Sequence, residues 1–509
     1  SLNAGGSGTP LSVGNLNLSS GSVLNFALGA PGSSAAVVKV AGNLVLDGTL
    51  NLSDAGGFGL GVYQLFSYGG SLTDNGLLYG SLPGTTQASD LTLQTSVAKQ
   101  FNLVVGGTSN VLFWDGSQTT GNGAVDGGDG SWDASSTNWT GSDGLLNQTW
   151  NSTFAVFQGT PGNVIVNGSM AVNGMQFASD GYTLVGGTAR ELLTNGITNV
   201  RVDGGNTASV NVAINGSGTL TKLDGGTLAL NVANGYTGGT ALNGGTLVVG
   251  NNGALGSGDL TAAGGTTLDS NSAISLGNNV VLNGALTIGG TRALTLNGVV
   301  SGAGSLVKNG IDSLTLNGLN TYAGGTVLNA GSLVLGNNGA LGSGALSVTG
   351  NAGLGNLSAL QLANDIGLGA QLTLAGNQNL TLNGVVSGTG LLVKNGTGNL
   401  TLNGVNTLSG GTVVNAGSLT LGNNAALGSG MLSVTGNGQL DGSSALQLAN
   451  NIGLRAQLTL GGAQNLTLNG LVVGNGGLIK NGVANLTLNG ANTYSGGTVL
   501  NAGSLTVGS

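Results

Sequence analysis

Short runs in which apolar residues alternate with threonine or serine recur along the chain. Leu-Thr-Leu-Asn-Gly stands at residues 294–298 and again at 314–318, and the same 20-residue step separates Leu380 from Leu400. Alternation with a period of two is expected of a strand with one buried face, and Asn-Gly favours a tight turn. The pattern therefore predicts many short strands joined by tight turns.

A longer period of 86 residues runs through the last three-fifths of the chain. Four lysines and the ends of four Gly-Gly-Thr triplets keep this step without an insertion: Lys222, Lys308, Lys394 and Lys480, and Thr240, Thr326, Thr412 and Thr498. A period this regular is typical of a stacked array of equivalent units. We predict an all-β fold, a right-handed parallel β-helix (β-solenoid) with about 20–22 residues per coil and four coils per 86-residue repeat.

The regularity and composition of the sequence divide the chain into seven segments. We expect irregular β-solenoid coils over 1–110, a loop-rich segment of Trp, Asp and Gly over 111–160, and further coils over 161–215. Three full repeats follow over 216–300, 301–386 and 387–472, and a partial fourth covers 473–509. Because the chain opens at Ser1 in mid-pattern, without an initiating Met or a signal peptide, we interpret it as a slice of a longer protein.

Composition excludes several classes of protein. Gly accounts for 103 of 509 residues, 39% of the chain is apolar and only 6% is charged, with a net charge of −8. A nucleic-acid partner would require a basic stripe, and ten Lys and Arg spread over the chain provide none. No apolar run approaches the length of a membrane-spanning helix, so we expect no membrane insertion. The absence of cysteine fits a large secreted chain.

The sequence contains few of the residues that enzymes commonly use for catalysis. The chain has no His and a single Glu, Glu191, which excludes His-based triads and His-ligated metals. The acidic residues that crowd together are Asp126, Asp129 and Asp133, in a Gly-rich stretch. Asp and backbone carbonyls on such a stretch are suitable calcium ligands, whereas a solvated turn is the alternative that we favour. We therefore expect no enzymatic activity and no cofactor, with calcium as a weak hypothesis.

Two further sets of residues are candidates for a binding surface. All four tryptophans, Trp114, Trp132, Trp139 and Trp150, lie in segment 111–160. They could form a sugar-stacking or protein-binding platform, but capping of a core is the interpretation we favour. The four periodic lysines would lie about 19 Å apart in a straight column. This column could serve lateral docking or anionic glycans, or the charges could simply keep a sheet edge soluble.

The 86-residue unit resembles a known repeat. The stretch from Leu306 to Leu333 contains Leu-Val-Lys-Asn-Gly, Leu-Thr-Leu-Asn-Gly, Asn-Thr-Tyr-Ala-Gly-Gly-Thr and Asn-Ala-Gly-Ser-Leu. This line is similar to the passenger-associated transport repeat of bacterial autotransporters, over residues 216–509. The resemblance implies a right-handed β-helical passenger domain on the cell surface, with an outer-membrane barrel on a C-terminal part. It brings no catalytic residues.

One repeat departs from this line. Leu408 stands where Tyr236, Tyr322 and Tyr494 stand in the other copies. The exchange indicates that the position buries apolar area and does not need a phenol hydroxyl.

A non-enzymatic surface protein is the function that we favour. The segment would act in adhesion, aggregation or biofilm matrix through polyvalent contacts with itself, with neighbouring surface proteins or with glycans on the outer surface of a Gram-negative cell. Two alternatives remain open: a structural subunit that self-assembles into surface filaments or lattices, and a stalk for an enzyme that lies outside this slice.

Overall fold

The computed structural model describes residues 1–5, 10–32, 37–107, 110–187 and 190–508. The chain divides into two compact units, Ser1–Thr261 (unit 1) and Ala262–Ser509 (unit 2). Almost all regular structure is β. The described residues contain one short helix, the 3-10 helix η2 (Ala88–Asp90).

Unit 1 begins with two small sheets. The first has the order β1 (Leu2–Gly5), β4 (Val23–Leu28), β6 (Leu44–Asp54) and β3 (Leu16–Asn17), with β8 (Leu72–Tyr79) also on β6. The second has the order β2 (Leu11–Val13), β5 (Val38–Val40), β7 (Gly61–Tyr68), β10 (Gln100–Val105) and β9 (Leu91–Gln94). The last three strands pair antiparallel, and Phe26, Phe66 and Phe101 meet edge to face in the core between the sheets.

Parallel coils follow in the rest of unit 1, on three faces. One face has the order β14 (Asn147–Gln148), β13 (Trp139–Thr140), β11 (Val111–Trp114), β15 (Phe154–Phe157), β18 (Gly174–Phe177), β21 (Ile197–Val202), β24 (Thr219–Leu223) and β27 (Thr240–Leu242), followed by β29 (Leu260–Ala262). The second has β12 (Gly130–Trp132), β16 (Asn163–Val166), β19 (Thr183–Gly186), β22 (Thr207–Asn211), β25 (Thr227–Leu230) and β28 (Thr246–Val249). The third has β17 (Ser169–Ala171), β20 (Glu191–Thr194), β23 (Ile214–Gly216) and β26 (Gly235–Tyr236).

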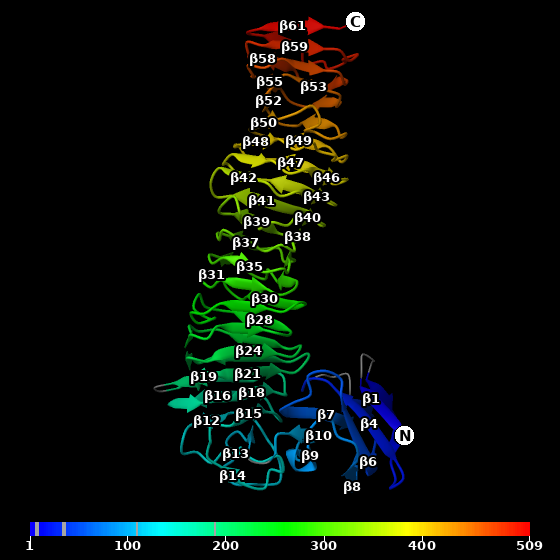
Figure 1. Ribbon diagram of the computed structural model, residues 1–509, viewed down its shortest axis with the longest axis vertical. Coiled ribbons are helices and arrows are strands. Elements are labelled where there is room, and N and C mark those ends of the chain that lie inside the picture. Colours follow the sequence, from blue (N-terminus) through cyan, green and yellow to red (C-terminus); the bar gives the residue numbers. More distant parts are fainter. Residues whose placement is uncertain (6–9, 33–36, 108–109, 188–189, 509) are drawn as a thin grey trace. The chain divides into compact units, whose positions relative to one another are not determined.

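Unit 2 continues the same construction with shorter strands, which lie one above another from green to red in Figure 1. Sheet I has the order β30 (Thr266–Ser270), β33 (Leu286–Ile288), β36 (Leu306–Lys308), β38 (Thr326–Leu328), β40 (Leu346–Val348), β43 (Ile366–Leu368) and β46 (Val386–Gly388). Sheet II has β31 (Ile274–Leu276), β34 (Leu294–Leu296), β37 (Ser313–Leu316), β39 (Ser332–Leu335), β41 (Ala352–Asn356), β44 (Leu372–Leu374), β47 (Leu392–Lys394), β49 (Thr412–Val414), β51 (Leu432–Val434), β54 (Ile452–Leu454) and β57 (Val472–Gly474).

Two more sheets and a strand pair complete unit 2. Sheet III has the order β42 (Leu360–Leu362), β45 (Leu380–Leu382), β48 (Asn399–Leu402), β50 (Ser418–Leu421), β52 (Gly438–Gly442), β55 (Leu458–Leu460), β58 (Leu478–Lys480) and β60 (Thr498–Leu500). Sheet IV has β53 (Leu446–Leu448), β56 (Leu466–Leu468), β59 (Asn485–Leu488) and β61 (Ser504–Val507). Strand β32 (Val280–Leu282) pairs with β35 (Val300–Ser301).

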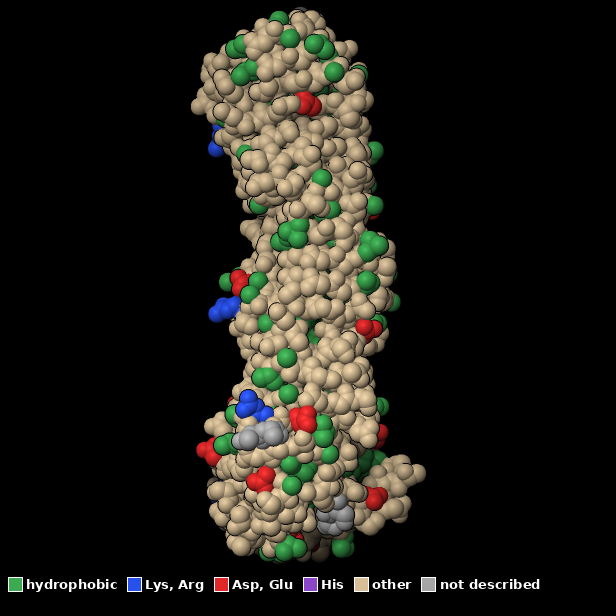
Figure 2. All heavy atoms as spheres, turned by 90° about the vertical axis from the view of Figure 1, so that its left-hand side faces the viewer, with side chains coloured by type: hydrophobic (Ala, Val, Ile, Leu, Met, Phe, Trp, Pro, Cys, Tyr) green, Lys and Arg blue, Asp and Glu red, His purple; other side chains and the backbone are tan. Residues whose placement is uncertain are grey.

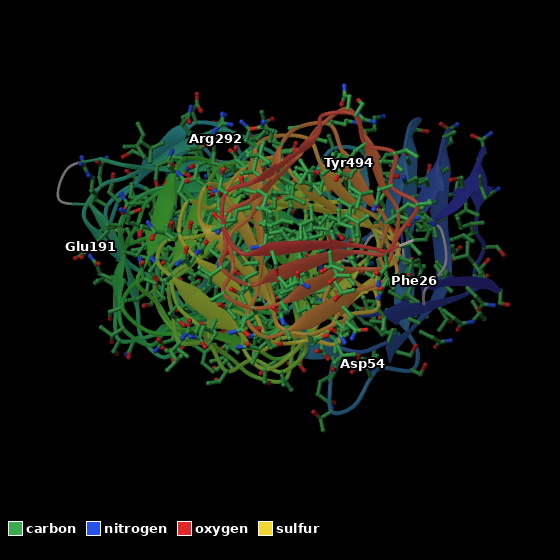
Figure 3. The ribbon with its side chains drawn as sticks, turned by 90° about the horizontal axis from the view of Figure 1, so that it is seen from above. Phe26, Asp54, Glu191, Arg292 and Tyr494 are labelled. Carbon is green, nitrogen blue, oxygen red and sulfur yellow. The ribbon has the colours of Figure 1, made fainter. Side chains whose placement is uncertain are left out.

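The three-residue strands show why this sequence forms coils. In β45 the leucines at 380 and 382 are buried, whereas Thr381 between them is only partly buried. Successive side chains of a strand point to opposite faces, so Leu-Thr-Leu places two leucines inside and one threonine outside. Seen from above in Figure 3, the sticks in the middle of the coils are largely carbon, while Glu191 and Arg292 lie at the periphery. The predicted parallel β-solenoid is confirmed.

The 86-residue repeat does not return to the same face. Strand register advances by 20 residues per coil, as from Leu306 to Thr326 to Leu346. Four such steps fall six residues short of 86, which is about one strand with its turn. Equivalent strands therefore move to the next sheet: β36 lies in sheet I, β47 in sheet II and β58 in sheet III.

Candidate functional sites

The four periodic lysines lie inside the coils. Lys222, Lys308, Lys394 and Lys480 are all buried, at most 4% exposed. The alternation of the strand explains this, because each lysine follows two residues after a buried leucine, as Lys308 follows Leu306. The expected row of surface charges is therefore wrong for these residues. It would also not be straight, since equivalent strands occupy different sheets.

Backbone carbonyls hold each buried ammonium group. Lys222 Nζ donates to Leu223 O at 2.7 Å, to Asp224 O at 2.8 Å and to Gly244 O at 3.2 Å. Lys394 Nζ repeats the arrangement with Gly396 O and, at 3.2 Å, Ala416 O. Burial lowers the pKa of all four lysines, and that of Lys222 to about 8. The ammonium groups of Lys222, Lys308 and Lys394 therefore link the turn after their own strand to the next coil. Lys480 Nζ donates to Gly482 O in the turn after its own strand.

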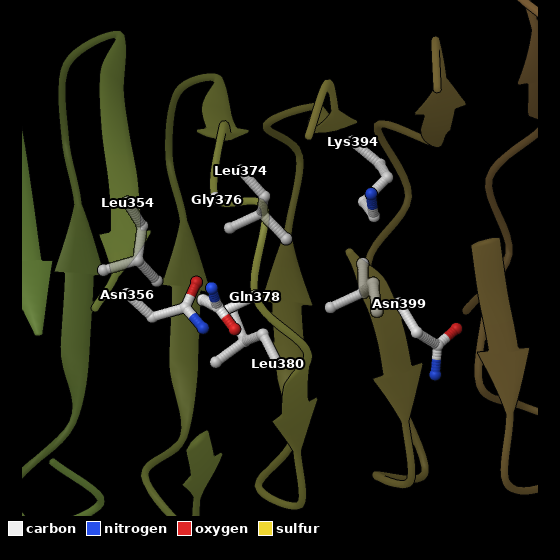
Figure 4. A pocket seen from close by; sticks show the side chains of 9 residues that line it. Leu354, Asn356, Leu374, Gly376, Gln378, Leu380, Lys394 and Asn399 are labelled. Atoms are coloured by element: carbon white, nitrogen blue, oxygen red, sulfur yellow. The ribbon is translucent and has the colours of Figure 1, made fainter. Parts of the chain in front are cut away.

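Small cavities lie beside two of these lysines. One, of about 10 Å³, is lined by Lys394 together with Leu354, Asn356, Leu374, Gly376, Gln378, Leu380, Asn399 and Leu400 (Figure 4). A second of the same size lies 86 residues further along and includes Lys480. This volume is close to the minimum that accommodates one water molecule, so neither cavity is a site for a larger ligand.

The four tryptophans pack together as a core. Trp114, Trp132 and Trp139 are fully buried and Trp150 is 9% exposed. Ring centroids of Trp139 lie 5.0 Å from Trp132 and 4.5 Å from Trp150. Trp114 Nε1 donates to Gly128 O and Trp150 Nε1 to Ala171 O. These rings fill the interior where long loops interrupt the coils, and they present no aromatic platform at the surface.

The three aspartates of the Gly-rich stretch have separate partners. Asp126 Oδ2 accepts from Asn122 Nδ2, and Asp129 Oδ1 accepts from the Asn163 N–H. Asp133 accepts hydrogen bonds from both Ser135 and Ser136. Although burial acts to raise it, these hydrogen bonds lower the pKa of Asp133 well below its ordinary value. Among the described residues no group of three or more acidic side chains could hold a metal ion, so the geometry does not support the calcium hypothesis.

A tyrosine–threonine pair recurs inside the repeats and is not among the sites predicted from the sequence. Tyr236 OH lies 2.7 Å from Thr240 Oγ1, and Tyr322 OH lies 2.5 Å from Thr326 Oγ1. In the third repeat Leu408 is buried in the same place, and Thr412 Oγ1 is buried without a hydrogen-bond partner among the described residues. The position therefore buries apolar area, as inferred from Leu408, but where the phenol hydroxyl is present it also satisfies the buried threonine. The constant spacing of four residues between Tyr and Thr is the signal that could have found the pair.

Repeated apolar side chains project from the surface of unit 2. Val299, Val385 and Leu471, spaced 86 residues apart, are 37–42% exposed. On the adjacent coil, Leu319 and Val405 are 68% and 65% exposed. The backbone brings each pair side by side, since Thr321 N donates to Val300 O and Thr407 N to Val386 O. These five residues are two pairs, Val299 with Leu319 and Val385 with Val405, and the single Leu471. We call them together the apolar surface pairs.

The apolar surface pairs do not share one face. Val299, Val385 and Leu471 directly precede β35, β46 and β57, which belong to three different sheets and end them at equivalent positions. Charged side chains are sparse and scattered among uncharged ones on the face shown in Figure 2. Unit 2 thus presents the same uncharged, partly apolar feature on successive faces.

Comparison with protein families supports the resemblance predicted from the sequence. Residues 220–249, 306–335, 392–421 and 478–507 match the passenger-associated-transport-repeat. Each matched segment contains a buried lysine, the Tyr–Thr pair or its Leu408 variant, and the strand between them. These matches confirm the resemblance to autotransporter passenger domains.

A curated relative points in the same direction. The chain is 40% identical over 278 residues to the adhesin BmaC autotransporter of Brucella suis biovar 1 (strain 1330). The match covers 49% of this chain and 8% of the relative's length. It supports display on the outside of the cell. No solved structure matches the chain. Within the described residues, no helix has the length and apolar character needed to cross a membrane.

Proposed function

We propose that this chain is a non-enzymatic passenger segment that mediates adhesion through polyvalent surface contacts. The apolar surface pairs carry this proposal, because they repeat one partly exposed apolar feature at a fixed spacing in sequence. A single pair offers too little area for a stable interface, which buries about 800 Å² per partner. Several pairs acting together gain affinity through their effective concentration.

The change of face between repeats decides which partners fit. Because the pairs lie on three different sheets, a flat partner can reach only part of them. A partner that surrounds the coils, such as a mesh of matrix molecules or several neighbouring surface proteins, can engage all of them. The spacing therefore favours adhesion within a matrix, including aggregation and biofilm, over a contact along one line.

Adherence of coated beads tests the proposal. Beads carrying the purified chain are compared with beads carrying a variant in which Val299, Leu319, Val385, Val405 and Leu471 are all changed to Ser. We expect adherence to cultured cells and to biofilm matrix to fall by about tenfold or more in the fivefold variant, and by much less when one pair is changed.

A matched control changes five other exposed apolar residues of unit 2 to Ser: Ile311, Leu357, Met431, Val483 and Val507. An equal loss in the control would attribute adherence to general surface hydrophobicity and would contradict the role of the pairs. Ordered fibres of the unmodified chain under the electron microscope would instead identify a self-assembling structural subunit. Beads that adhere nowhere would leave a stalk as the function.

A further inference from the structure

A groove of about 370 Å³ lies in unit 1, whereas the apolar surface pairs belong to unit 2. Its lining comes from three segments and includes Val97, Ala98, Gln100, Val125, Asp126 and Pro161. Its volume lies within the range of small-ligand sites, which are commonly found where two parts of a chain meet. Here the loop before β10 meets the coils that begin at β11.

The walls of the groove are fastened to one another. Val125 N donates to Ser96 O at 3.1 Å, and Thr160 N donates to Asp126 O at 2.8 Å. The buried carboxylate of Asp115 accepts from the Asp126 N–H at 2.8 Å, which holds the loop from below. These bonds join the three segments, so a ligand would meet a groove that is already formed.

The groove combines an apolar floor with uncharged and acidic hydrogen-bonding groups. Val97 and Val125 are 4% and 3% exposed and belong to a core cluster. Asp126 Oδ2 accepts from Asn122 Nδ2, which leaves Oδ1 as an acceptor without a partner among the described residues. Gln100 Oε1 accepts from Gln158 Nε2 at 3.1 Å and Asn102 Nδ2 at 3.3 Å, which leaves Gln100 Nε2 as a donor.

A cluster of buried amide side chains lies beside the groove. Gln94, Asn102 and Gln158 are at most 1% exposed, yet Gln94 Nε2, Asn102 Oδ1 and Gln158 Oε1 have no hydrogen-bond partner among the described residues. Buried polar groups are nearly always satisfied, so three unsatisfied amide atoms in one connected cluster require an explanation. The cluster is joined to the groove through Gln100.

We propose that this groove binds one residue of a neutral sugar. A hydroxyl group both donates and accepts, so adjacent sugar hydroxyls can donate to Asp126 and accept from Gln100 Nε2. The C–H face of the ring would lie on Val97, Val125 and Pro161. No cation lines the groove, and the nearby Lys99 Nζ is held by Gly70 O and the Tyr68 ring, so an anionic ligand is disfavoured. This site goes beyond the adhesion proposed above, because it uses other residues in the other unit.

Saturation-transfer NMR with the purified chain tests the proposal, with glucose, galactose, mannose and N-acetylglucosamine as probes. We expect at least one probe to bind with a Kd on the order of 1 mM. Asp126→Ala and Gln100→Ala should each weaken that binding by about tenfold, since each removes a hydrogen bond to the ligand. Ala98→Trp, on an exposed rim position, should abolish it by filling the groove.

The control is Asp143→Ala, which removes an exposed carboxylate that does not line the groove and should leave binding unchanged. An unchanged melting temperature shows that each variant is folded. Failure of all four sugars to bind, or equal binding by Asp126→Ala, Ala98→Trp and the unmodified chain, would overturn the proposal. Binding of ethylamine but of no sugar, with an affinity that falls with salt, would identify a site for cations instead. Bead adherence can survive any of these outcomes, so the two proposals fail separately.

Discussion

At the residue scale, one hydroxyl group distinguishes the third repeat from its neighbours. Burial raises the pKa of Tyr322 to about 12, so its phenol is protonated at neutral pH and shares a hydrogen bond with Thr326. Leu408 fills the same buried place without that hydroxyl, and Thr412 is left with an unsatisfied oxygen. The repeat tolerates the exchange because apolar area is retained, at the expense of one buried polar atom.

Leu408→Tyr should therefore stabilise the protein. We expect the free energy of unfolding to rise by about 1 kcal/mol, because Thr412 gains a buried hydrogen bond. Thermal and urea unfolding measure the change. Leu408→Phe is the matched control, since it adds the ring without the hydroxyl. A gain for Phe as large as that for Tyr would show that ring packing, and not the hydrogen bond, is responsible.

The buried lysines are the second residue-scale feature. Lys394→Met keeps most of the apolar stem but leaves Gly396 O and Ala416 O without their donor. We expect a loss of about 1–3 kcal/mol in the free energy of unfolding, as for other buried acceptors that lose a partner. Lys39→Met, which changes an exposed lysine, should have little effect. If Lys394→Met were stabilising, the cost of burying the ammonium group would outweigh its hydrogen bonds.

At the scale of elements, segment 111–160 replaces regular coils with an aromatic core. Trp114 and Trp139 are both fully buried and their rings are in contact. They differ at the indole nitrogen: Trp114 Nε1 donates to Gly128 O, whereas Trp139 Nε1 has no partner among the described residues.

Trp→Phe substitutions at these two positions should separate ring packing from hydrogen bonding. Both variants lose similar buried area, and Trp114→Phe also leaves Gly128 O without its donor. We expect Trp114→Phe to be about 1 kcal/mol more destabilising than Trp139→Phe. Urea unfolding followed by the remaining tryptophan fluorescence gives the comparison. Equal losses would mean that water replaces the indole donor at Gly128.

A buried polar network joins the strands of the N-terminal sheets to the coils. Gln176 on β18 exchanges two hydrogen bonds with the backbone of Val62 on β7, and its Nε2 also donates to Asp203 Oδ1. Burial raises the pKa of Asp203 to about 7, with Asp224 adding to the effect and Arg201 and Lys222 opposing it. The neighbouring Arg201 and Asp224 form an ion pair at 2.9 Å.

This network predicts a pH dependence with an unusual sign. A carboxyl whose folded pKa lies above its unfolded value keeps its proton longer in the folded state. The folded state therefore binds more protons between about pH 4 and pH 7, and stability falls as the pH rises through that window. We expect a contribution of roughly 2–4 kcal/mol, at about 1.4 kcal/mol per pKa unit.

Asp203→Asn should remove this contribution. The difference in the free energy of unfolding between the variant and the unmodified chain, measured from pH 4 to pH 8, should grow with pH in favour of the variant. Asp180→Asn, a matched change on the same coils, should leave the slope unchanged. Parallel pH profiles for Asp203→Asn and the unmodified chain would show that Asp203 ionises normally.

At the scale of the whole molecule, the mismatch between two periods organises unit 2. The coil advances by 20 residues and the repeat by 86, so each repeat begins about one strand further around the coil. Lys308, Lys394 and Lys480 therefore lie in sheets I, II and III, and the apolar surface pairs follow the same progression. Repeats can be identical in sequence and still face different directions.

Deleting one complete repeat should leave a folded protein. Removal of residues 345–430 joins Gly344 to Met431, which occupies the position equivalent to Ala345. Because each repeat contacts its neighbours in the same way, we expect retained β circular dichroism and cooperative unfolding, with a nearly additive loss of stability. Removal of residues 345–420 deletes about half a coil less than a complete repeat, so inward-facing and outward-facing positions no longer match those of the neighbouring coil. We expect this deletion to abolish cooperative unfolding in unit 2. Equal behaviour of the two deletions would contradict this account.

The local alternation of apolar and polar residues was sufficient to determine the strands, the solenoid and its repeat. Leu380–Leu382 illustrates this: its side chains point in, out and in as a period of two requires. The same rule, applied to Leu306–Lys308, places the lysine inside, whereas the usual exposure of charged side chains predicts the opposite. A repeat of 86 residues is not a multiple of the 20-residue coil, which likewise excludes a straight column of lysines.

Only the tertiary structure decided what the polar groups do. The hydrogen bonds of Lys222 and the lack of a partner at Thr412 depend on contacts between coils about 20 residues apart. The separation of Asp126, Asp129 and Asp133 depends on contacts between distant loops. The groove at Gln100 and Asp126 depends on three segments that are remote in sequence. Alternation is a property of neighbouring residues and can be read locally. Hydrogen bonding and burial depend on which atoms meet after folding. The order of residues does not give the distances between atoms that are remote in sequence.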